Sequence, residues 1–241
     1  MTEFEKTLWA DSEFAQNYRD DANIYLPFRS QFIELAKSIF DYFVKDASRA
    51  RILDLGCGDA IFVQELLKKY SPSRISLVDG SKEMLQAARK RLGENEKISF
   101  IKASFQDLLR GEILNENFDF VYSSLAIHHL PFDEKKELYS YIFKRLSSGG
   151  YFVLYDVVLP ATENIEKYHL ALWKKWIKEH PSKEQAQKLL DIPEQYKANS
   201  DNIPDTLSSQ LQILEEIGFK DVSCHFKYGI FALFGGLKHK Q

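Results

Sequence analysis

The sequence predicts an α/β fold: a doubly wound, mostly parallel seven-stranded sheet with an antiparallel last strand and a helical cap. From residue 51 onward, short apolar runs alternate with helical ones, which is the order of a parallel sheet with helices on both faces. The runs are almost continuously apolar, as is typical of strands buried on both sides. The last two runs follow each other too closely for a crossover helix, so they are expected to pair antiparallel.

The individual elements follow from the same alternation. The five expected parallel strands are residues 51–55, 74–79, 98–103, 118–124 and 151–158. Helices are expected between them at residues 60–70, 81–92 and 133–146. A further helix at 205–218 precedes the closing strands at 219–229 and 230–238.

Residues 1–241 are expected to form one domain, with two helical segments added to the sheet. Residues 1–47 are amphipathic and helical, with an interruption at Pro27. Residues 160–205 are predicted to be helices separated by prolines and to form a cap insertion. An insertion of this size usually covers a site.

Composition argues against several classes of function. A net charge of −3 gives no electrostatic footprint for DNA or RNA, so a nucleic-acid partner is not expected. Cys57 and Cys224 are too few for a disulfide framework or a cysteine-rich metal site. The acidic N-terminus lacks a signal-peptide core, and no run approaches the ~20 apolar residues that span a bilayer. A cytoplasmic protein without a membrane partner is expected, and its 12 tyrosines and 18 phenylalanines are compatible with a homodimer.

The stretch RILDLGCGDA, residues 51–60, ends a predicted strand in a glycine turn that opens a helix. Gly56 and Gly58 allow backbone torsions and a close approach to a ligand that a side chain would prevent. The following helix presents free N–H groups to a polar ligand. A dinucleotide-binding turn needs a third small residue where Ile61 stands, so the turn does not match that fingerprint.

Three carboxylates indicate what the turn binds. Asp54 and Asp59 flank the glycines and would repel a diphosphate, whereas they would attract a ligand with sulfonium and ammonium groups. Asp79 ends the second strand, where it could accept hydrogen bonds from both ribose hydroxyls of an adenosine. Its alternative role is to cap the helix that begins near Ser81. The pattern favours a cationic nucleoside over NAD.

The chain resembles the class I S-adenosylmethionine (SAM)-dependent methyltransferases. ILDLGCGDA looks like the family's glycine-rich motif, with Ala60 in place of the usual third glycine, and LVDGSKEML looks like its acidic ribose-binding motif. IKASFQDL resembles the adenine-binding stretch, FDFVYSSLAIHHL the fourth-strand motif, and RLSSGGYFVLYD the turn into the fifth strand. The resemblance covers residues 25–159 and extends to the closing strands.

The resemblance implies SAM as cofactor, S-adenosylhomocysteine (SAH) as product, and in-line attack by an acceptor on the methyl group. In the family, aspartate is common where Ser104 stands, so backbone contacts and stacking by Phe105 are expected at the adenine. The segment before the first strand is implied to fold over the cofactor as a lid, where the fork of Arg29 suits the methionine carboxylate. The residues implied to bind the cofactor are Tyr25, Arg29, Asp54, Gly56, Cys57, Gly58, Asp79, Gly80, Ser81, Met84, Ser104, Phe105 and Ser124.

His128 and His129 follow the fourth strand, where the methyl group would lie. In some small-molecule methyltransferases a histidine at this motif orients or deprotonates the acceptor, and a general base contributes about 10²–10⁴-fold. His129 is the expected base, with His128 and Tyr18 as further catalytic candidates; alternatively, both histidines are structural. No metal is expected, because the two histidines are adjacent and no partner has recognisable ligand spacing.

The expected function is transfer of a methyl group from SAM to a small-molecule acceptor, with the accepting atom unspecified. One alternative is a relative of the carboxy-SAM synthases, whose layout is similar, although a carboxylated cofactor needs an additional arginine and residues 160–218 contain none. A tRNA-modifying methyltransferase is another, and a non-catalytic SAM-binding regulatory protein is a third. An oxidoreductase is disfavoured by Ile61 and Asp59.

Overall fold

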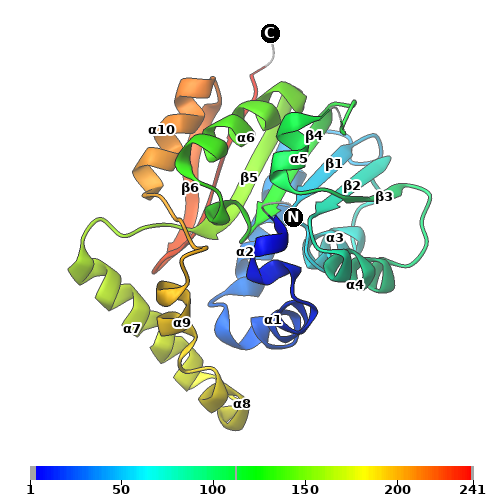
Figure 1. The fold of residues 1–241 in the computed structure, drawn as a ribbon. Coiled ribbons are helices and arrows are strands. Elements are labelled where there is room, and N and C mark those ends of the chain that lie inside the picture. The colour runs from blue at the N-terminus through cyan, green and yellow to red at the C-terminus, as the bar shows by residue number, and fades with distance from the viewer. Residues whose placement is uncertain (1–3, 112, 240–241) are drawn as a thin grey trace.

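The computed structural model describes residues 4–111 and 113–239 and contains one seven-stranded sheet in that part of the chain (Figure 1). The strands are β1 (Arg51–Leu55), β2 (Arg74–Asp79), β3 (Ile98–Lys102), β4 (Phe118–Ser124), β5 (Leu146–Val157), β6 (Lys220–Tyr228) and β7 (Phe231–Leu237). Their order is β3-β2-β1-β4-β5-β7-β6. The pairs among β1 to β5 are parallel, and β7 is antiparallel to both of its neighbours. The predicted fold class is confirmed.

Most predicted strand boundaries lie within a residue or two of the observed ones. The exception is β5, which begins at Leu146 rather than at residue 151. Leu146 pairs with Phe118, and the register shifts before Tyr151 pairs with Phe120. The strand therefore includes the Gly149–Gly150 segment, whose glycines suggest a turn when only the sequence is considered.

Helices cover both faces of the sheet, as a doubly wound fold requires. On one face, α2 (Arg29–Phe43), α3 (Ile61–Leu67) and α4 (Lys82–Leu92) pack against strand residues such as Ile52 and Phe120. On the other face, α5 (Phe105–Arg110), α6 (Phe132–Arg145) and α10 (Leu207–Ile217) pack against Leu53 and Val121. Successive strand residues thus point to opposite faces, and both faces are apolar because both are buried.

The N-terminal segment and the cap pack against each other below the sheet (Figure 1). The N-terminal segment consists of η1 (Phe4–Lys6), η2 (Leu8–Ala10) and α1 (Ser12–Tyr25), and the cap consists of α7 (Glu163–Glu179), α8 (Lys183–Lys188) and α9 (Ile192–Ala198). Two indole N–H groups join the two segments: Trp173 Nε1 donates to the Tyr25 carbonyl at 2.5 Å, and Trp176 Nε1 donates to the Ile24 carbonyl at 3.2 Å. These bonds satisfy the last carbonyls of α1, which have no partner within their own helix.

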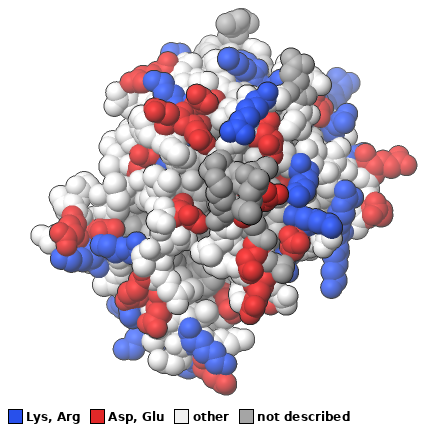
Figure 2. All heavy atoms as spheres, viewed as in Figure 1, with Lys and Arg blue, Asp and Glu red and all other residues white. Residues whose placement is uncertain are grey.

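Charged side chains of both signs are interspersed over the face shown in Figure 2. Many cap lysines lie beside carboxylates: Lys174 contacts Glu194 at 2.7 Å, and Lys197 contacts Glu166 at 2.7 Å. No helix in the described ranges combines the length and the apolar character needed to cross a membrane.

The glycine turn lies where the strand order reverses, because β1 has β2 on one side and β4 on the other. Gly56 and Gly58 both adopt left-handed backbone conformations, with φ of 64° and 53°. A Cβ atom on Gly56 would lie only 2.5 Å from Ala126 Cβ in the loop after β4, whereas a Cβ on Gly58 would be 4.0 Å from its nearest neighbour, Met84 Sδ. Ala60, which replaces the family's usual third glycine, is also left-handed at φ 59°.

The two glycines therefore form a matched pair of substitution sites. We expect Gly58→Ala to lower the free energy of unfolding by about 1–2 kcal/mol, because only the left-handed backbone is penalised. Gly56→Ala should cost a further ~1–3 kcal/mol, because the new methyl group also overpacks against Ala126. Urea titration of both variants measures the difference, and equal losses would contradict the close contact.

Candidate functional site

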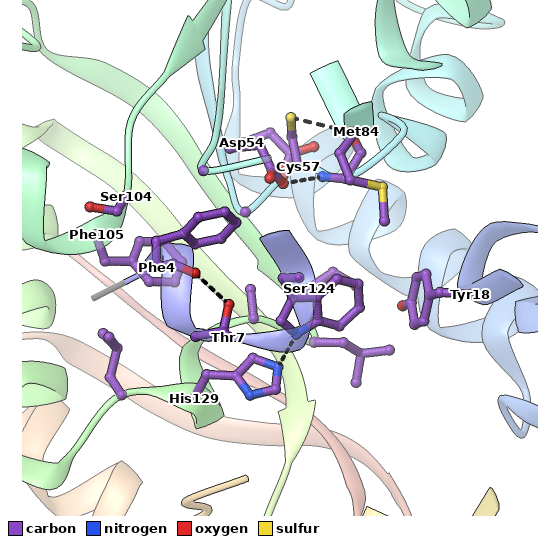
Figure 3. Close-up of a pocket in the computed structure, with 18 of the residues that line it drawn as sticks. Phe4, Thr7, Tyr18, Asp54, Cys57, Met84, Ser104, Phe105, Ser124 and His129 are labelled. Atoms are coloured by element: carbon purple, nitrogen blue, oxygen red, sulfur yellow. Dashed lines mark hydrogen bonds between the residues drawn. The ribbon is translucent and has the colours of Figure 1, made fainter. Parts of the chain in front are cut away.

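A cavity of about 390 Å³ lies at the carboxyl ends of β1, β2 and β4 (Figure 3). Ligands of doubly wound proteins bind at this edge, and the volume falls within the range of small-molecule sites. Thirteen of the residues singled out from the sequence line it: Tyr18, Arg29, Asp54, Gly56, Cys57, Gly58, Asp79, Gly80, Met84, Ser104, Phe105, Ser124 and His129.

Three other residues singled out from the sequence do not line the cavity. Tyr25 is buried edge-on to Tyr18, with ring centroids 6.1 Å apart. Ser81 caps α4, where its hydroxyl oxygen accepts the Met84 N–H at 3.3 Å. His128 is buried against Asp156, its Nδ1 lying 2.5 Å from Oδ1 of that carboxylate.

The carboxylate of Asp79 accepts hydrogen bonds from two backbone N–H groups. Its Oδ2 accepts from Gly58 N and its Oδ1 from Ser81 N, both at 2.8 Å. Burial raises the pKa of Asp79 to about 6, although these two hydrogen bonds favour the charged form and oppose the shift. The carboxylate is thus fixed at the end of β2 with its remaining acceptor capacity facing the cavity.

Asp54 and Asp59 differ in the charge they leave for a ligand. Asp54 is 2% exposed, and its Oδ1 has no hydrogen-bond partner within the described residues. Burial raises the pKa of Asp54 well above its usual value, and the charges of Asp79 and Asp59 add to the shift. Asp59, by contrast, forms a salt bridge with Arg91. Asp54 is therefore an unpaired acceptor at the cavity that suits a cationic or hydrogen-bond-donating group. The charge of Asp59, which was expected from the sequence to attract a cationic ligand, is instead balanced by Arg91.

Two phenylalanine rings border the part of the cavity next to Gly80 (Figure 3). Phe4 comes from η1, and a Cβ atom on Gly80 would lie 2.6 Å from its ring. Phe105 begins α5, and its ring lies 3.3 Å from the position of a Cβ on Gly56. The Ser104 hydroxyl donates to Asp107 Oδ2 at 2.7 Å in a capping box, so it is engaged by the protein.

Tyr18 and Arg29 approach the cavity from α1 and α2. Burial raises the pKa of Tyr18, while the positive charge of Arg29 lowers it. Arg29 Nη1 donates to Asn23 Oδ1 at 2.8 Å. Of the arginine and lysine side chains in the described chain, only that of Arg29 lines the cavity.

The hydrogen bonds of His129, in η3 (Ile127–His129), fix its tautomer. Trp9 Nε1 lies 2.8 Å from His129 Nε2, and an indole nitrogen can only donate, so Nε2 must be the unprotonated acceptor. The Asp201 carbonyl lies 2.9 Å from His129 Nδ1 and can only accept, so Nδ1 carries the proton. Both contacts require the same tautomer, with the lone pair of Nε2 directed at the indole N–H.

His129 is also held in its neutral form. Burial lowers the pKa of its imidazole well below the usual value of 6.5, and the neighbouring His128 and Lys135 add to the decrease. The hydrogen bond to the Asp201 carbonyl opposes this shift. A neutral imidazole with an unprotonated Nε2 is the form that can accept a proton, once the indole N–H of Trp9 no longer occupies that lone pair.

The chain returns from the cap through residues 199–206, the cap return segment. This segment forms hydrogen bonds with the loop that carries the histidines and with the end of β5. Ile203 N donates to the His128 carbonyl at 2.9 Å, and Leu159 N donates to the Asp205 carbonyl at 2.9 Å. Lys135 is wholly buried, and its Nζ donates to the Ile203 carbonyl and to Asp205 Oδ2, the latter at 2.5 Å. This lysine thus ties α6 to the segment whose Asp201 carbonyl orients His129.

The sequence did not point to four residues that shape the site: Phe4, Trp9, Lys135 and Asp201. Only Lys135 had a usable signal, because it shares one face of the predicted helix 133–146 with Leu138 and Ile142, where a lysine is unexpected. In the described part of the chain, no group of three or more His, Cys, Asp and Glu side chains could hold a metal ion.

Comparison with known proteins gives a consistent result. Residues 52–150 match the family model described as a methyltransferase domain. The chain is 24% identical over 236 residues to carboxy-S-adenosyl-L-methionine synthase from Campylobacter lari, covering 97% of this chain and 96% of that protein. It is 30% identical over 118 residues to malonyl-[acyl-carrier protein] O-methyltransferase from Halalkalibacterium halodurans, covering 49% of this chain and 42% of that protein.

A crystal structure from Methanococcus maripaludis has the same fold. That protein is provisionally described as an S-adenosyl-L-methionine-dependent methyltransferase, and it matches with a TM-score of 0.65 at 19% identity. The match covers 100% of this chain and 98% of that one, so it includes the N-terminal segment and the cap as well as the sheet.

The buried lysine provides a test of how the cap return segment is held. We expect Lys135→Met to lower the free energy of unfolding by about 3 kcal/mol, the lower end of the range for a broken buried pair, because Asp205 keeps some contact with water. Chemical denaturation measures the loss. Lys136→Met, which changes an exposed neighbour on the same helix, should stay within ~0.5 kcal/mol of the wild type. Equal effects of the two changes would contradict the role of Lys135.

Proposed function

Because the chain belongs to the class I SAM-dependent methyltransferase family, we propose that it transfers the methyl group of SAM to a small-molecule acceptor, with His129 as general base. The observation that carries this proposal is the tautomer of His129. Its two hydrogen bonds place the proton on Nδ1 and the lone pair on Nε2, and His129 lines the cavity. An acceptor that must lose a proton needs such a base within hydrogen-bond reach.

The residues of the cavity fit SAM group by group. When bound, SAM supplies an electrophilic methyl group attached to a cationic sulfur. Asp79 has acceptor capacity for the ribose hydroxyls, and the unpaired Oδ1 of Asp54 suits the ammonium group. Arg29 provides the cation for the methionine carboxylate, and the rings of Phe4 and Phe105 border a slot for the adenine.

The surroundings of His129 favour a small acceptor over a macromolecule. Phe4 and Trp9 border the cavity from the N-terminal segment, and Ser200, Asp201 and Ile203 border it from the cap return segment. An acceptor must fit between these two segments to reach Nε2. We therefore assign residues 1–47 a lid role and residues 160–205 a role in covering the acceptor.

A carboxy-SAM synthase is the second candidate, because the chain matches such an enzyme over nearly its whole length. A carboxylated cofactor brings a second negative charge, and Arg29 is the one cation that the described residues contribute to the cavity lining. The charge balance therefore favours SAM. Calorimetric titration with SAM and with carboxy-SAM distinguishes the two, and tighter binding of carboxy-SAM would reverse this assignment.

Asp79 should make cofactor binding depend on pH. Its pKa is raised to about 6 by burial, so the carboxylate takes up a proton as the pH falls through that value. We expect the affinity for SAM to be constant above neutral pH and to fall by up to about tenfold per pH unit below about pH 6. Calorimetry across this range measures the profile.

Asp79→Asn serves as the test variant for that profile. It should lose most of the affinity for SAM at neutral pH and show a flatter pH profile, with Asp54 as the remaining titrating carboxylate. Asp133→Asn, which changes an exposed aspartate on α6, should leave both the affinity and the profile as in the wild type. Normal SAM affinity in Asp79→Asn would remove this residue from the ribose site.

His129→Gln should lower the rate of SAH formation by about 10²–10⁴-fold while leaving the affinity for SAM within about twofold, because only the base is lost. In the wild type the rate should be independent of pH at neutrality and fall only in acid, since the pKa of His129 is lowered. His169→Gln, in the cap, is the matched control. Imidazole ¹⁵N chemical shifts test the tautomer without any acceptor, and a protonated Nε2 at neutral pH would refute the assignment.

A further inference from the structure

We propose that Asp156, at the end of β5, is a positioning residue for the base: it holds His128, and through His128 it fixes the surroundings of His129. This inference rests on the proposed function, because it concerns the residue that was assigned there as general base. Asp156 is not among the residues that line the cavity, so it acts on His129 only through other residues.

The carboxylate of Asp156 is wholly buried and binds one residue, His128, at two points. Its Oδ2 accepts the backbone N–H of His128 at 2.9 Å, and its Oδ1 lies 2.5 Å from His128 Nδ1. Because a carboxylate only accepts, Nδ1 of His128 is the donor. The Val157 N–H also donates to Oδ1, at 3.0 Å. These contacts fix both the backbone and the ring of His128.

His128 in turn contacts the surroundings of His129 in two ways. The centroids of the two imidazole rings are 4.0 Å apart, with an interplanar angle of 42°. The His128 carbonyl accepts the Ile203 N–H at 2.9 Å, which holds the cap return segment. Earlier in that segment, the Asp201 carbonyl accepts the proton of His129 Nδ1. Asp156 therefore stands at one end of a chain of contacts that reaches the ring proton of the base.

Stability alone does not account for a carboxylate in this position. Asp156 has no exposed surface, and its neighbours in the strand, Tyr155 and Val157, belong to the apolar core. Buried charged groups can often be replaced by apolar residues of similar volume without loss of stability. The carboxylate provides what an apolar side chain does not, a defined direction for two N–H groups of His128. That direction matters for His129, because a misplacement of about 1 Å in a catalytic group can cost about 10²-fold in rate.

Asp156→Asn tests the proposal, because asparagine keeps the shape of the side chain but has an NH₂ donor in place of one acceptor oxygen. One N–H of His128 then loses its acceptor. We expect the fixed tautomer of His129 to be lost: the form protonated on Nε2 should rise from a minor species to more than about 10% of the population. This change appears as a convergence of the two ¹⁵N chemical shifts of the ring.

Selective ¹⁵N labelling of the six histidines provides the spectrum, and the signals of His129 are those missing from His129→Gln. Calorimetric titration of Asp156→Asn with SAH should give the wild-type affinity, because Asp156 lies outside the cavity lining. The loss is thus expected in the base and not in the cofactor site.

Asp119→Asn is the matched control. Asp119 also accepts a backbone N–H within the sheet, that of Arg51 at 2.9 Å, but near the amino-terminal ends of β1 and β4. Both changes should lower the free energy of unfolding, which chemical denaturation measures. Only Asp156→Asn should alter the signals of His129, whereas a purely structural role would make the two variants alike.

His128→Asn and His128→Ala test the same contact from the other side, and they remain informative if Asp156→Asn does not fold. The side-chain amide of asparagine can still donate to Asp156, whereas alanine cannot. We expect His128→Asn to keep the fixed tautomer of His129 and His128→Ala to lose it.

The proposal is overturned if the His129 signals are unchanged in Asp156→Asn or in His128→Ala, or if they change as much in Asp119→Asn or in His128→Asn. None of these spectra requires an acceptor. Failure to bind SAH, or an unchanged rate of SAH formation in His129→Gln, would instead count against the proposed function, so the two failures are distinguishable.

Discussion

At the point where the strand order reverses, the turn after β1 touches the loop after β4, and Gly56 has no room for a side chain beside Ala126. This contact fixes the relative position of two loops that come from distant parts of the chain. The first loop presents the Gly58 N–H to Asp79 and buries Asp54. The second carries His128 and His129 over the same space. The parts of the cavity that we assign to the cofactor and to the acceptor are thus positioned by one backbone approach, which the helices on both faces of the sheet hold in place.

Two of the carboxylates at this point do not favour the stability of the free protein in their charged form. Burial raises the pKa of Asp54 and of Asp79, which means that the folded protein disfavours their charged forms. Asp59, in contrast, forms a salt bridge with Arg91. The cationic nucleoside that we propose as the ligand would supply the interactions that Asp54 and Asp79 lack, which would couple ligand binding to folding through these two side chains.

How well a feature can be predicted from the sequence depends on how far apart along the chain its interacting residues lie. The strands and the Gly56–Asp79 arrangement were predictable because apolar runs and turn glycines express local requirements of a buried parallel sheet. The environment of His129 was not predictable, because its two hydrogen-bond partners are distant in the sequence. Trp9 lies 120 residues from His129 along the chain, and Asp201 lies 72 residues from it. These contacts arise when the N-terminal segment and the cap return segment meet over the sheet, and neither segment has a periodicity that encodes the meeting. The extension of β5 was missed for a related reason, since pairing with β4 overrides the turn preference of two glycines.

The indole of Trp9 has a consequence for water as well as for the acceptor. A histidine with an exposed lone pair beside an electrophilic methyl group would activate a water molecule, and the methyl donor would be hydrolysed without benefit. With the indole N–H bonded to Nε2, that lone pair is occupied until another donor replaces it. With His129 as the proposed base, the N-terminal segment would therefore protect the methyl donor from hydrolysis, because Nε2 would become accessible only in exchange for an acceptor.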